Sequence, residues 1–315
     1  MNLPWIESPF FDEIVDSQQL SEDQRKLARE YNKNGFIVVK DAFSDDLLEE
    51  VKSEMHTKGF NPDFKTDIPR NEQRVQDLWM HSDPVKQVAS SPVIIDTLKM
   101  LYGRDAIPFQ TLNFPVGSQQ RAHSDTIHFS SLPARFMCGV WVALEDISEE
   151  QGPVFYYPGS HKLPEYDFSH FKVSVEDTNY YDYPSYEDFI EKIVTTSGYP
   201  KKLFEAKKGD ALIWSSNIIH GGSPVLKEKS TRYSQVTHYY FKDCIYYTPM
   251  LSNMVTNELF LRHDVKDIRT GEVVPQSFNG IELNHVQTGS SKFILNNRLK
   301  GIEKKGFLER FGLKF

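Results

Sequence analysis

The 315-residue sequence has little cysteine and no long apolar run, and these absences narrow the classes of protein to which it can belong. Its two cysteines, Cys138 and Cys244, lie far apart, which excludes a disulfide framework and a cysteine-rich zinc cluster. No apolar stretch approaches the roughly 20 residues that cross a bilayer, and the N-terminus lacks the regions of a signal peptide. We therefore expect a cytoplasmic protein with reduced thiols and no membrane partner.

Basic residues are also in short supply. The sequence has 36 Lys and Arg against 44 Asp and Glu, a formal net charge of −8. An acidic chain binds nucleic acid poorly unless it carries a local basic patch, so we expect no nucleic-acid partner. Aromatic residues, in contrast, make up 13% of the chain. They favour half-buried strands and pocket walls, which favours β structure for this chain. The composition leaves the oligomeric state undecided.

Helix signals dominate residues 1–104. The run "SEDQRKLAREYNKNG" opens with the capping-box pair Ser21 and Gln24 and closes at Gly35. The run "SDDLLEEVKSEMHTKG" starts at an N-cap, Ser44, with acidic residues in its first turn, and "SPVIIDTLKMLYG" shows a third helix. Only "FIVVKDAF" reads as a strand in this region. We expect these helices to wrap around a core formed by the rest of the chain.

The character of the sequence changes in residues 105–245. Short runs rich in β-branched and aromatic residues are separated by Gly, Pro and Asp turns, as in "MCGVWVALEDI", "GPVFYYPGSH", "GDALIWSSNIIHGGS" and "TRYSQVTHYYF". Many short strands without helices between them favour a sandwich or jelly roll. We predict a single mainly β domain over 1–315, with flanking helices, a double-stranded β-helix (jelly-roll, cupin-like) core and a C-terminal extension at 246–315.

Residues 162–205 interrupt the strand pattern and are rich in Tyr, Asp and Phe. A connection this long inside a compact fold is often functional, for example a lid. Alternatively, it forms a surface helix and turns that cover one face of a sheet. Both interpretations stay open at this point.

Two types of metal ligand lie close together in "QQRAHSDTIHF". His123 and Asp125 stand at i and i+2, so in a strand both would project from the same face. Together they offer two of the three ligands of a 2-His-1-carboxylate site, which holds Fe(II) and leaves positions open for O2 and a cosubstrate. His220, in "WSSNIIHGGSPV", follows an apolar strand and is the candidate third ligand. A jelly roll brings such distant strands side by side.

A candidate anion-binding pair follows in "STRYSQVTHYYF". Arg232 offers a guanidinium that can grip a carboxylate through two parallel hydrogen bonds. Ser234, two residues on, lies on the same strand face and can support that carboxylate. The pair fits a dicarboxylic cosubstrate that chelates iron at one end and meets Arg232 at the other.

Three further polar residues could complete the site. Gln110 and Gln120 lie on and just after an expected core strand, where they would bond the cosubstrate or substrate, or simply the strand and turn. His128 either lines the substrate pocket or is a structural histidine. We assign Gln110 to the cosubstrate, and Gln120 and His128 to the substrate, as hypotheses.

These runs resemble the phytanoyl-CoA dioxygenase family of Fe(II)/2-oxoglutarate oxygenases. The resemblance is carried by "HSDTIHF", "GVWVALED", "GPVFYYPGSHK", "GDALIWSSNIIHGGSPV" and "TRYSQVTHYYF". It covers residues 105–245 well and residues 30–60 loosely. The combination of motifs is far more specific than any one of them.

The resemblance implies a set of residue roles. His123, Asp125 and His220 would bind iron, Arg232 would bind the far carboxylate of 2-oxoglutarate, and Trp141 would lie against this cosubstrate.

One position departs from the pattern of the family. Some members have a serine two residues after the distal histidine, whereas Gly222 stands there in this chain. The supporting hydroxyl must then come from elsewhere, and Ser234 and Ser223 are the candidates.

We therefore expect an enzyme that uses Fe(II), 2-oxoglutarate and O2 to hydroxylate a small organic metabolite, with release of succinate and CO2. Because the carboxylate ligand Asp125 is present, no ligand position is left for a halide, although desaturation and ring closure stay open. Two other functions also stay open. One is a non-catalytic cupin-like protein that binds a metabolite or sugar, and the other is a metal-dependent non-redox enzyme. The sequence does not specify the substrate.

Overall fold

The structure is a computed structural model, and it describes residues 2–59, 74–171, 182–253, 258–283, 285–288 and 292–295. Its α-helices are α1 (Phe11–Ser17), α2 (Glu22–Asn34), α3 (Asp45–Glu54), α4 (Asp83–Ala89), α5 (Pro92–Tyr102) and α6 (Tyr183–Ser197). Its short helical segments are η1 (Trp5–Glu7), η2 (Met55–Gly59), η4 (Leu78–Met80), η5 (Asp125–Ile127), η6 (Glu149–Gln151), η7 (Ser160–Lys162), η8 (Phe168–His170) and η10 (Pro249–Leu251).

The helix ends that carry clear capping signals form as predicted. Ser21 and Gln24 make a reciprocal capping box at the start of α2, which closes at Gly35 with a left-handed φ of 82°. The hydroxyl of Ser44 accepts the backbone N–H of Leu47 and caps α3. Two short helices, α1 and α4, lie beyond the predicted ones. The helical N-terminal region is therefore confirmed and extended.

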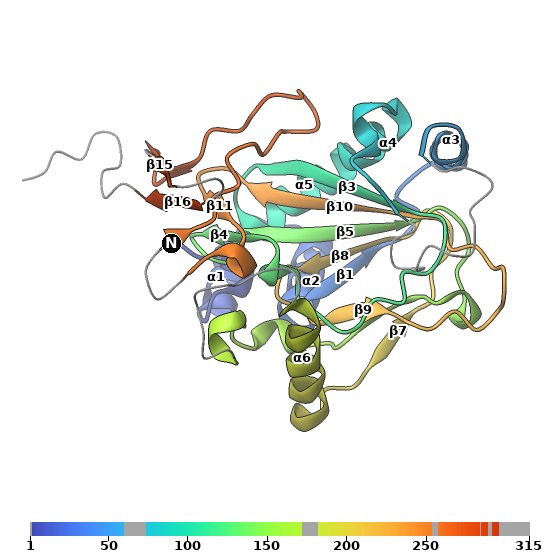
Figure 1. Ribbon diagram of the computed structural model, residues 1–315, viewed down its shortest axis with the longest axis horizontal. Coiled ribbons are helices and arrows are strands. Elements are labelled where there is room, and N and C mark those ends of the chain that lie inside the picture. Colours follow the sequence, from blue (N-terminus) through green and yellow to red (C-terminus); the bar gives the residue numbers. More distant parts are fainter. Residues whose placement is uncertain are drawn as a thin grey trace, which may run out of the picture.

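One large antiparallel sheet forms the centre of the molecule, with strands that run side by side in Figure 1. In spatial order its strands are β1 (Phe36–Val39), β8 (Ala211–Ser215), β5 (Met137–Ala143), β10 (Ser234–Phe241), β3 (Ala106–Phe114) and β2 (Val75–Gln76). A second sheet contains β7 (Lys202–Phe204), β6 (Val154–Tyr156) and β9 (His220–Gly222).

The other strands of the described residues form two strand pairs and one three-stranded sheet. They are β4 (Ser130–Leu132) with β11 (Ile245–Tyr247), β13 (Ser277–Phe278) with β14 (Ile281–Glu282), and β12 (Glu258–Leu259) and β15 (His285–Thr288) on either side of β16 (Lys292–Leu295). Among all the residues that the structure describes, no helix combines the length and the apolar character that a membrane span requires.

Alternating side chains give the large sheet two buried faces. From β5, Trp141 and Ala143 join a cluster with Val154 and Phe204 of the second sheet, so the two sheets pack face to face. The residues that alternate with them, Val140 and Val142, turn the other way and pack among the helices. The predicted double-stranded β-helix is therefore present, with the helices on its outer side.

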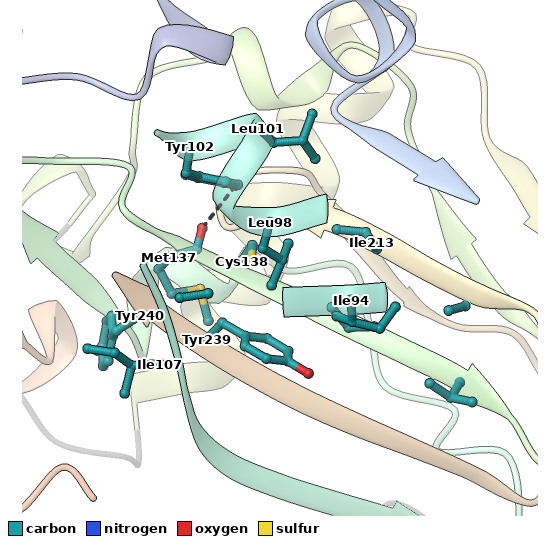
Figure 2. Close-up of a cluster of buried hydrophobic side chains, with 14 of the residues drawn as sticks. Ile94, Leu98, Leu101, Tyr102, Ile107, Met137, Cys138, Ile213, Tyr239 and Tyr240 are labelled. Atoms are coloured by element: carbon teal, nitrogen blue, oxygen red, sulfur yellow. Dashed lines mark hydrogen bonds between the residues drawn. The ribbon is translucent and has the colours of Figure 1, made fainter. Parts of the chain in front are cut away.

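Helix α5 covers this outer face. Figure 2 shows Leu98 of α5 directed toward Cys138 of the large sheet, with Ile94 and Tyr239 nearby, and Leu101 belongs to the same apolar cluster. All five side chains are buried. Since both faces of the central strands are apolar, the strands read in sequence as nearly continuous hydrophobic runs.

The run "GDALIWSSNIIHGGS" forms two strands instead of one. Its first half is β8 of the large sheet, and its second half is β9 of the small sheet. The chain turns between them at Ser216 and Asn217, where the Asn217 amide donates to the carbonyls of His161 and Leu163. This corner carries His220 from one sheet to the other.

Within 162–205, helix α6 packs Tyr186, Ile190 and Val194 against the small sheet through Phe155 and Ile219. This agrees with the interpretation as a surface helix that covers a sheet face, and Figure 1 shows α6 beside β9. Residues 172–181 lie outside the described residues. The interpretation of the segment as a lid stays a prediction, as does the division into domains.

Gly139 admits the large indole of Trp214, its cross-strand partner on β8. A Cβ at Gly139 would lie 2.4 Å from Cε2 of Trp214. We predict that Gly139→Ala lowers the free energy of unfolding in urea by about 1–3 kcal/mol, as overpacking of a core does. The clash should disappear in a Trp214→Leu background, so an equal cost of Gly139→Ala in both backgrounds would contradict this explanation.

Candidate active site

Three metal-ligand side chains converge in a buried group. The ligand atoms of His123, Asp125 and His220 all lie within 4.8 Å of one another. Nε2 of His123 is 3.9 Å, and Nε2 of His220 is 3.8 Å, from Oδ1 of Asp125. Two bonds of about 2.1 Å to a central metal span up to about 4.2 Å, so one ion can be held by all three. The structure thus brings together the three predicted ligands.

A direct backbone pairing brings the two histidines together. His123 and His220 form an antiparallel bridge, in which each backbone N–H donates to the carbonyl of the other at 2.9 Å. Their ring centroids are 4.5 Å apart. The bridge joins two segments that are distant in the sequence and places both imidazoles on one side.

Asp125 reaches the site by a route that differs from the prediction. His123 is an isolated bridge residue, and Asp125 opens the short helical turn η5, so the two do not share a regular strand. Ser124 between them is extended, with φ −114° and ψ 141°, and this keeps the two side chains on one side. The Ser124 hydroxyl bonds to Thr126 and to the carbonyl of Ser216, which holds the turn.

Backbone carbonyls orient both imidazole rings. Nδ1 of His123 lies 2.9 Å from the carbonyl of Arg121, and Nδ1 of His220 lies 3.1 Å from the carbonyl of Ile218. Each contact requires the proton on Nδ1, so the lone pair of Nε2 faces the group. This is the usual way in which proteins orient metal-binding histidines.

Burial keeps these histidines neutral. It is the main cause that lowers the pKa of His123 and of His220 to about 4, and the nearby Asp125 only partly offsets it at His123. Both rings therefore carry a free lone pair at neutral pH, which a metal ligand needs.

Trp214 fixes the carboxylate. Its indole N–H donates to Oδ2 of Asp125 at 2.7 Å, which leaves Oδ1 directed at the two histidines. His238 also approaches, with Nε2 3.9 Å from Oδ2, but on the side of the carboxylate that Trp214 already occupies. The sequence motifs did not predict a role for Trp214 or His238, because both residues lie far from Asp125 in the sequence and only the fold brings them to it.

A cavity of about 960 Å³ opens on this group. It is large enough for two small ligands, since sites for drug-sized molecules measure about 300–1,000 Å³. Its wall includes most of the predicted site residues together with several that were not predicted: Arg74, Gln76, Gln110, Ser118, Gln120, His128, Phe129, Trp141, Tyr183, Glu187, Arg232, His238 and Arg262.

Arg232 lies in this wall, 2% exposed. Its Nη1 donates to the carbonyl of Gly152 at 3.3 Å, whereas Nε has no hydrogen-bond partner, and no carboxylate of the described residues pairs with it. Its guanidinium carbon lies 5.7 Å from the ring of Phe114 and 5.8 Å from that of Trp141. Burial lowers its pKa to about 10, so it remains charged at neutral pH. A buried cation without a counter-charge fits an anionic ligand.

Trp141 adds a second unsatisfied donor beside Arg232. Its indole N–H is buried and has no hydrogen-bond partner among the residues that the structure describes. Buried polar groups are normally paired, so this part of the wall is built for a polar ligand. A dicarboxylate fits here because two predicted residues, Arg232 and Trp141, each present a buried N–H donor that has no partner among the described residues.

The structure offers a different hydroxyl from those predicted. Ser234 and Ser223 are buried, their hydroxyls have no partner, and neither lines the cavity. Ser118 does line it, and its Oγ lies 2.5 Å from the place that a Cβ of Gly222 would occupy. A serine at position 222 therefore cannot fit, and Ser118 presents a hydroxyl in that space. Ser118 lies five residues before His123 and belongs to none of the motifs that indicated the site, so the sequence did not predict this role.

The remaining predicted residues also face the cavity. The Gln110 carbonyl oxygen lies 3.1 Å from Nδ1 of His238, which ties it to the strand beside it. The Gln120 amide donates to the Tyr183 hydroxyl of α6 at 3.3 Å. His128 stacks obliquely near Tyr183, with ring centroids 5.0 Å apart. Their assignment to cosubstrate or substrate stays a prediction.

Comparison with known proteins agrees with this geometry. A family model described as phytanoyl-CoA dioxygenase matches residues 31–233, more than half of the chain. Over 264 residues the chain is 25% identical to the peroxisomal phytanoyl-CoA dioxygenase of Rattus norvegicus, covering 75% of this chain and 73% of that protein. It is 24% identical over 212 residues to a probable alpha-ketoglutarate-dependent hypophosphite dioxygenase of Stutzerimonas stutzeri, covering 62% and 71%.

Solved structures share the fold. The epimerase SnoN from nogalamycin biosynthesis, in complex with Fe3+, alpha ketoglutarate and nogalamycin RO, superposes with a TM-score of 0.56 at 19% identity, over 80% of this chain and 95% of that one. EctD from S. alaskensis, with 2-oxoglutarate and 5-hydroxyectoine, gives a TM-score of 0.52 at 18% identity, over 70% and 76%. At these identities the likeness concerns the fold alone.

The jelly roll and its buried His–Asp–His group define an Fe(II)/2-oxoglutarate-dependent oxygenase, which works with iron, 2-oxoglutarate and O2. Within this class, the chain belongs to the phytanoyl-CoA dioxygenase family. The expected enzyme is thereby confirmed over the non-catalytic binding protein. The rat relative is named as peroxisomal, and the cytoplasmic location expected for this chain stays a prediction.

We predict that Trp214→Phe weakens iron binding by about 10–100-fold, because it removes a hydrogen bond that orients a ligand. Anaerobic titration with Fe(II) measures the change. Trp79→Phe is the matched control, since the Trp79 indole N–H also donates to an aspartate, Asp77, but outside the cavity. Equal iron affinity in the wild type and Trp214→Phe would show that Asp125 needs no such support.

Proposed function

We propose that this protein hydroxylates a small organic metabolite and converts 2-oxoglutarate to succinate and CO2 in the same reaction. The observation that carries the proposal is the pairing, in one cavity, of a buried His–Asp–His group with a buried arginine that lacks a counter-charge. A hydrolase or isomerase that used the same three ligands would have no need for this arginine.

His123, Asp125 and His220 would hold the iron. Trp214 keeps Oδ1 of Asp125 directed at the metal position, and the carbonyls of Arg121 and Ile218 hold the two imidazoles with Nε2 inward. With iron and 2-oxoglutarate bound, the site would support the four-electron reduction of O2, with two electrons from 2-oxoglutarate and two from the substrate. One oxygen atom enters succinate and the other is inserted into a substrate C–H bond.

Arg232 would bind the far carboxylate of 2-oxoglutarate. The free Nε of Arg232 and the free indole N–H of Trp141 give two donors for this anion, and Ser118 offers a hydroxyl nearby in place of the serine absent at Gly222. Burial strengthens such charge-assisted hydrogen bonds and excludes competing water.

The carboxylate of Asp125 supports hydroxylation over halogenation. With three protein ligands in place and 2-oxoglutarate and O2 in the open positions, no position is left for a halide. Tyr183, His128 and Gln120, on the wall formed with α6, would contact the substrate and set which C–H bond lies close to the iron.

Arg232→Ala should raise the KM for 2-oxoglutarate by about tenfold or more, because the loss of a buried charge pair costs on the order of 2–5 kcal/mol. Iron content should stay at the wild-type level, which separates this effect from damage to the metal site. Arg104→Ala is the control, since Arg104 also lies over an aromatic ring, that of Phe136, but outside the cavity. An unchanged KM would place the cosubstrate anchor elsewhere.

The outcome of the oxidation can be read from the product. A metabolite screen scored by succinate release identifies a substrate, which is then converted under labelled O2 in high chloride. We expect one labelled oxygen atom in the product and one succinate for each product molecule, by mass spectrometry. A product that contains chlorine, or one that lost two hydrogens without gaining oxygen, would contradict hydroxylation.

A further inference from the structure

A second arginine, Arg262, reaches the cavity from the C-terminal extension. Its backbone is held firmly: its N–H donates to the carbonyl of Tyr246, and its carbonyl accepts the side-chain amide of Gln276, both at 2.9 Å. The preceding residue, Leu261, bridges to Tyr247. The extension, whose role the sequence left open, thus delivers one cationic side chain to the wall of the site.

Among the described residues, the guanidinium of Arg262 has no counter-charge. It packs over the ring of Phe129 at 4.8 Å and over that of Phe109 at 5.6 Å. Its Nη1 makes one long contact of 3.5 Å with the Thr248 hydroxyl, and its buried Nε has no hydrogen-bond partner in the part of the chain that the structure describes. No carboxylate of the described residues lies within ion-pair distance of it. Donors in this state are available to an oxyanion.

Arg262 and Arg232 lie toward opposite ends of β3. Arg262 packs on Phe109 near the start of the strand, and Arg232 lies beside Phe114 at its end. Five residues of strand span about 16 Å. One 2-oxoglutarate that meets Arg232 therefore leaves Arg262 free for a different ligand.

Arg262 is also close to the reaction centre. The Phe129 ring on which it packs lies 4.8 Å from the ring of His238, whose Nε2 is 3.9 Å from Asp125. The charge of Arg262 is one of the causes, after burial, that lower the pKa of His238 and of His128. A ligand held by Arg262 would thus lie within a small molecule's length of the metal position.

The charges around the cavity favour an anion at this end. Arg74 lines the wall as a further cation. Among the described residues, the acidic groups in the wall are Asp125, which is directed at the metal position, and Glu187, which lies 3.9 Å from Arg121. Neither of them neutralises Arg262.

We propose that Arg262 binds an oxyanion of the substrate, so that the substrates of this enzyme are small molecules with a carboxylate or phosphate group. The fork of donors on a guanidinium matches both groups through two parallel hydrogen bonds. The aromatic side chains of Phe129, His128 and Tyr183 would contact the carbon skeleton that joins this anion to the oxidised C–H bond. The inference rests on the proposed function, because it takes the Arg232 end as the 2-oxoglutarate site.

The test uses the enzyme with Mn(II) in place of iron, since Mn(II) does not turn over and strongly relaxes nearby nuclei. With 2-oxoglutarate at saturation, the probes are inorganic phosphate, read by ³¹P NMR, and acetate and acetamide, read through their methyl protons. We expect relaxation of phosphate or acetate above that of neutral acetamide. Phosphate alone would indicate phosphate esters, acetate alone carboxylic acids, and both a general oxyanion site. Equal relaxation of acetamide and both anions would overturn the proposal.

Variants assign the effect to one side chain. Arg262→Gln should weaken binding of the anion by about tenfold or more. Arg269→Gln removes an arginine of the same extension that pairs with Asp267 outside the cavity, and should leave anion binding unchanged. Undiminished binding in Arg262→Gln would overturn the proposal. If that variant does not fold, equal relaxation of the anions and acetamide on the wild type would still overturn the proposal.

The same samples separate this proposal from the one on which it rests. Protons of 2-oxoglutarate should be relaxed by Mn(II) in the wild type. If they are not, the proposed oxygenase site is wrong. If they are, and no anion is relaxed above acetamide, the oxygenase site stands and only the assignment of Arg262 fails.

Discussion

The backbone bridge between His123 and His220 is the interaction on which the site depends. It ties the segment after β3 to the corner between β8 and β9, and so sets two imidazoles 4.5 Å apart. The carboxylate of Asp125 then needs only the turn at η5 and the Trp214 hydrogen bond to complete the group. Because these contacts form on folding, the metal meets a prepared site and little ordering is left for binding.

The cavity is unusual in its charges rather than in its shape. Arg232 and Arg262 are set among aromatic rings and have donors without partners. Arg232 is buried and Arg262 is partly buried, and a buried cation reduces the stability of the folded protein unless a ligand neutralises it. Binding of two anions, the cosubstrate and the substrate, would therefore supply the missing counter-charge at both ends of the cavity.

The sequence predicted the parts whose signals are local or chemical. Capping residues such as Ser21 marked helix ends, and the ligand types of His123, Asp125 and His220 indicated a metal site that the fold does assemble. It did not predict the turn that carries Asp125, or the contributions of Trp214, Ser118 and Arg262. These depend on which distant strands and loops meet, and a single sequence holds no local trace of that. At Gly222 the sequence shows that the serine of some family members is absent. Only the structure shows that the Ser118 hydroxyl lies in the space that a side chain at position 222 would occupy.

Iron stoichiometry of the ligand variants tests the central claim most directly. After anaerobic reconstitution with Fe(II), the wild type should hold one iron per chain, and His123→Ala, Asp125→Ala and His220→Ala should each hold far less. His128→Ala is the matched control, because it removes a partly buried histidine from the same cavity wall and should keep the wild-type content. Undiminished iron in all three ligand variants, or a loss in His128→Ala as large as theirs, would contradict the account.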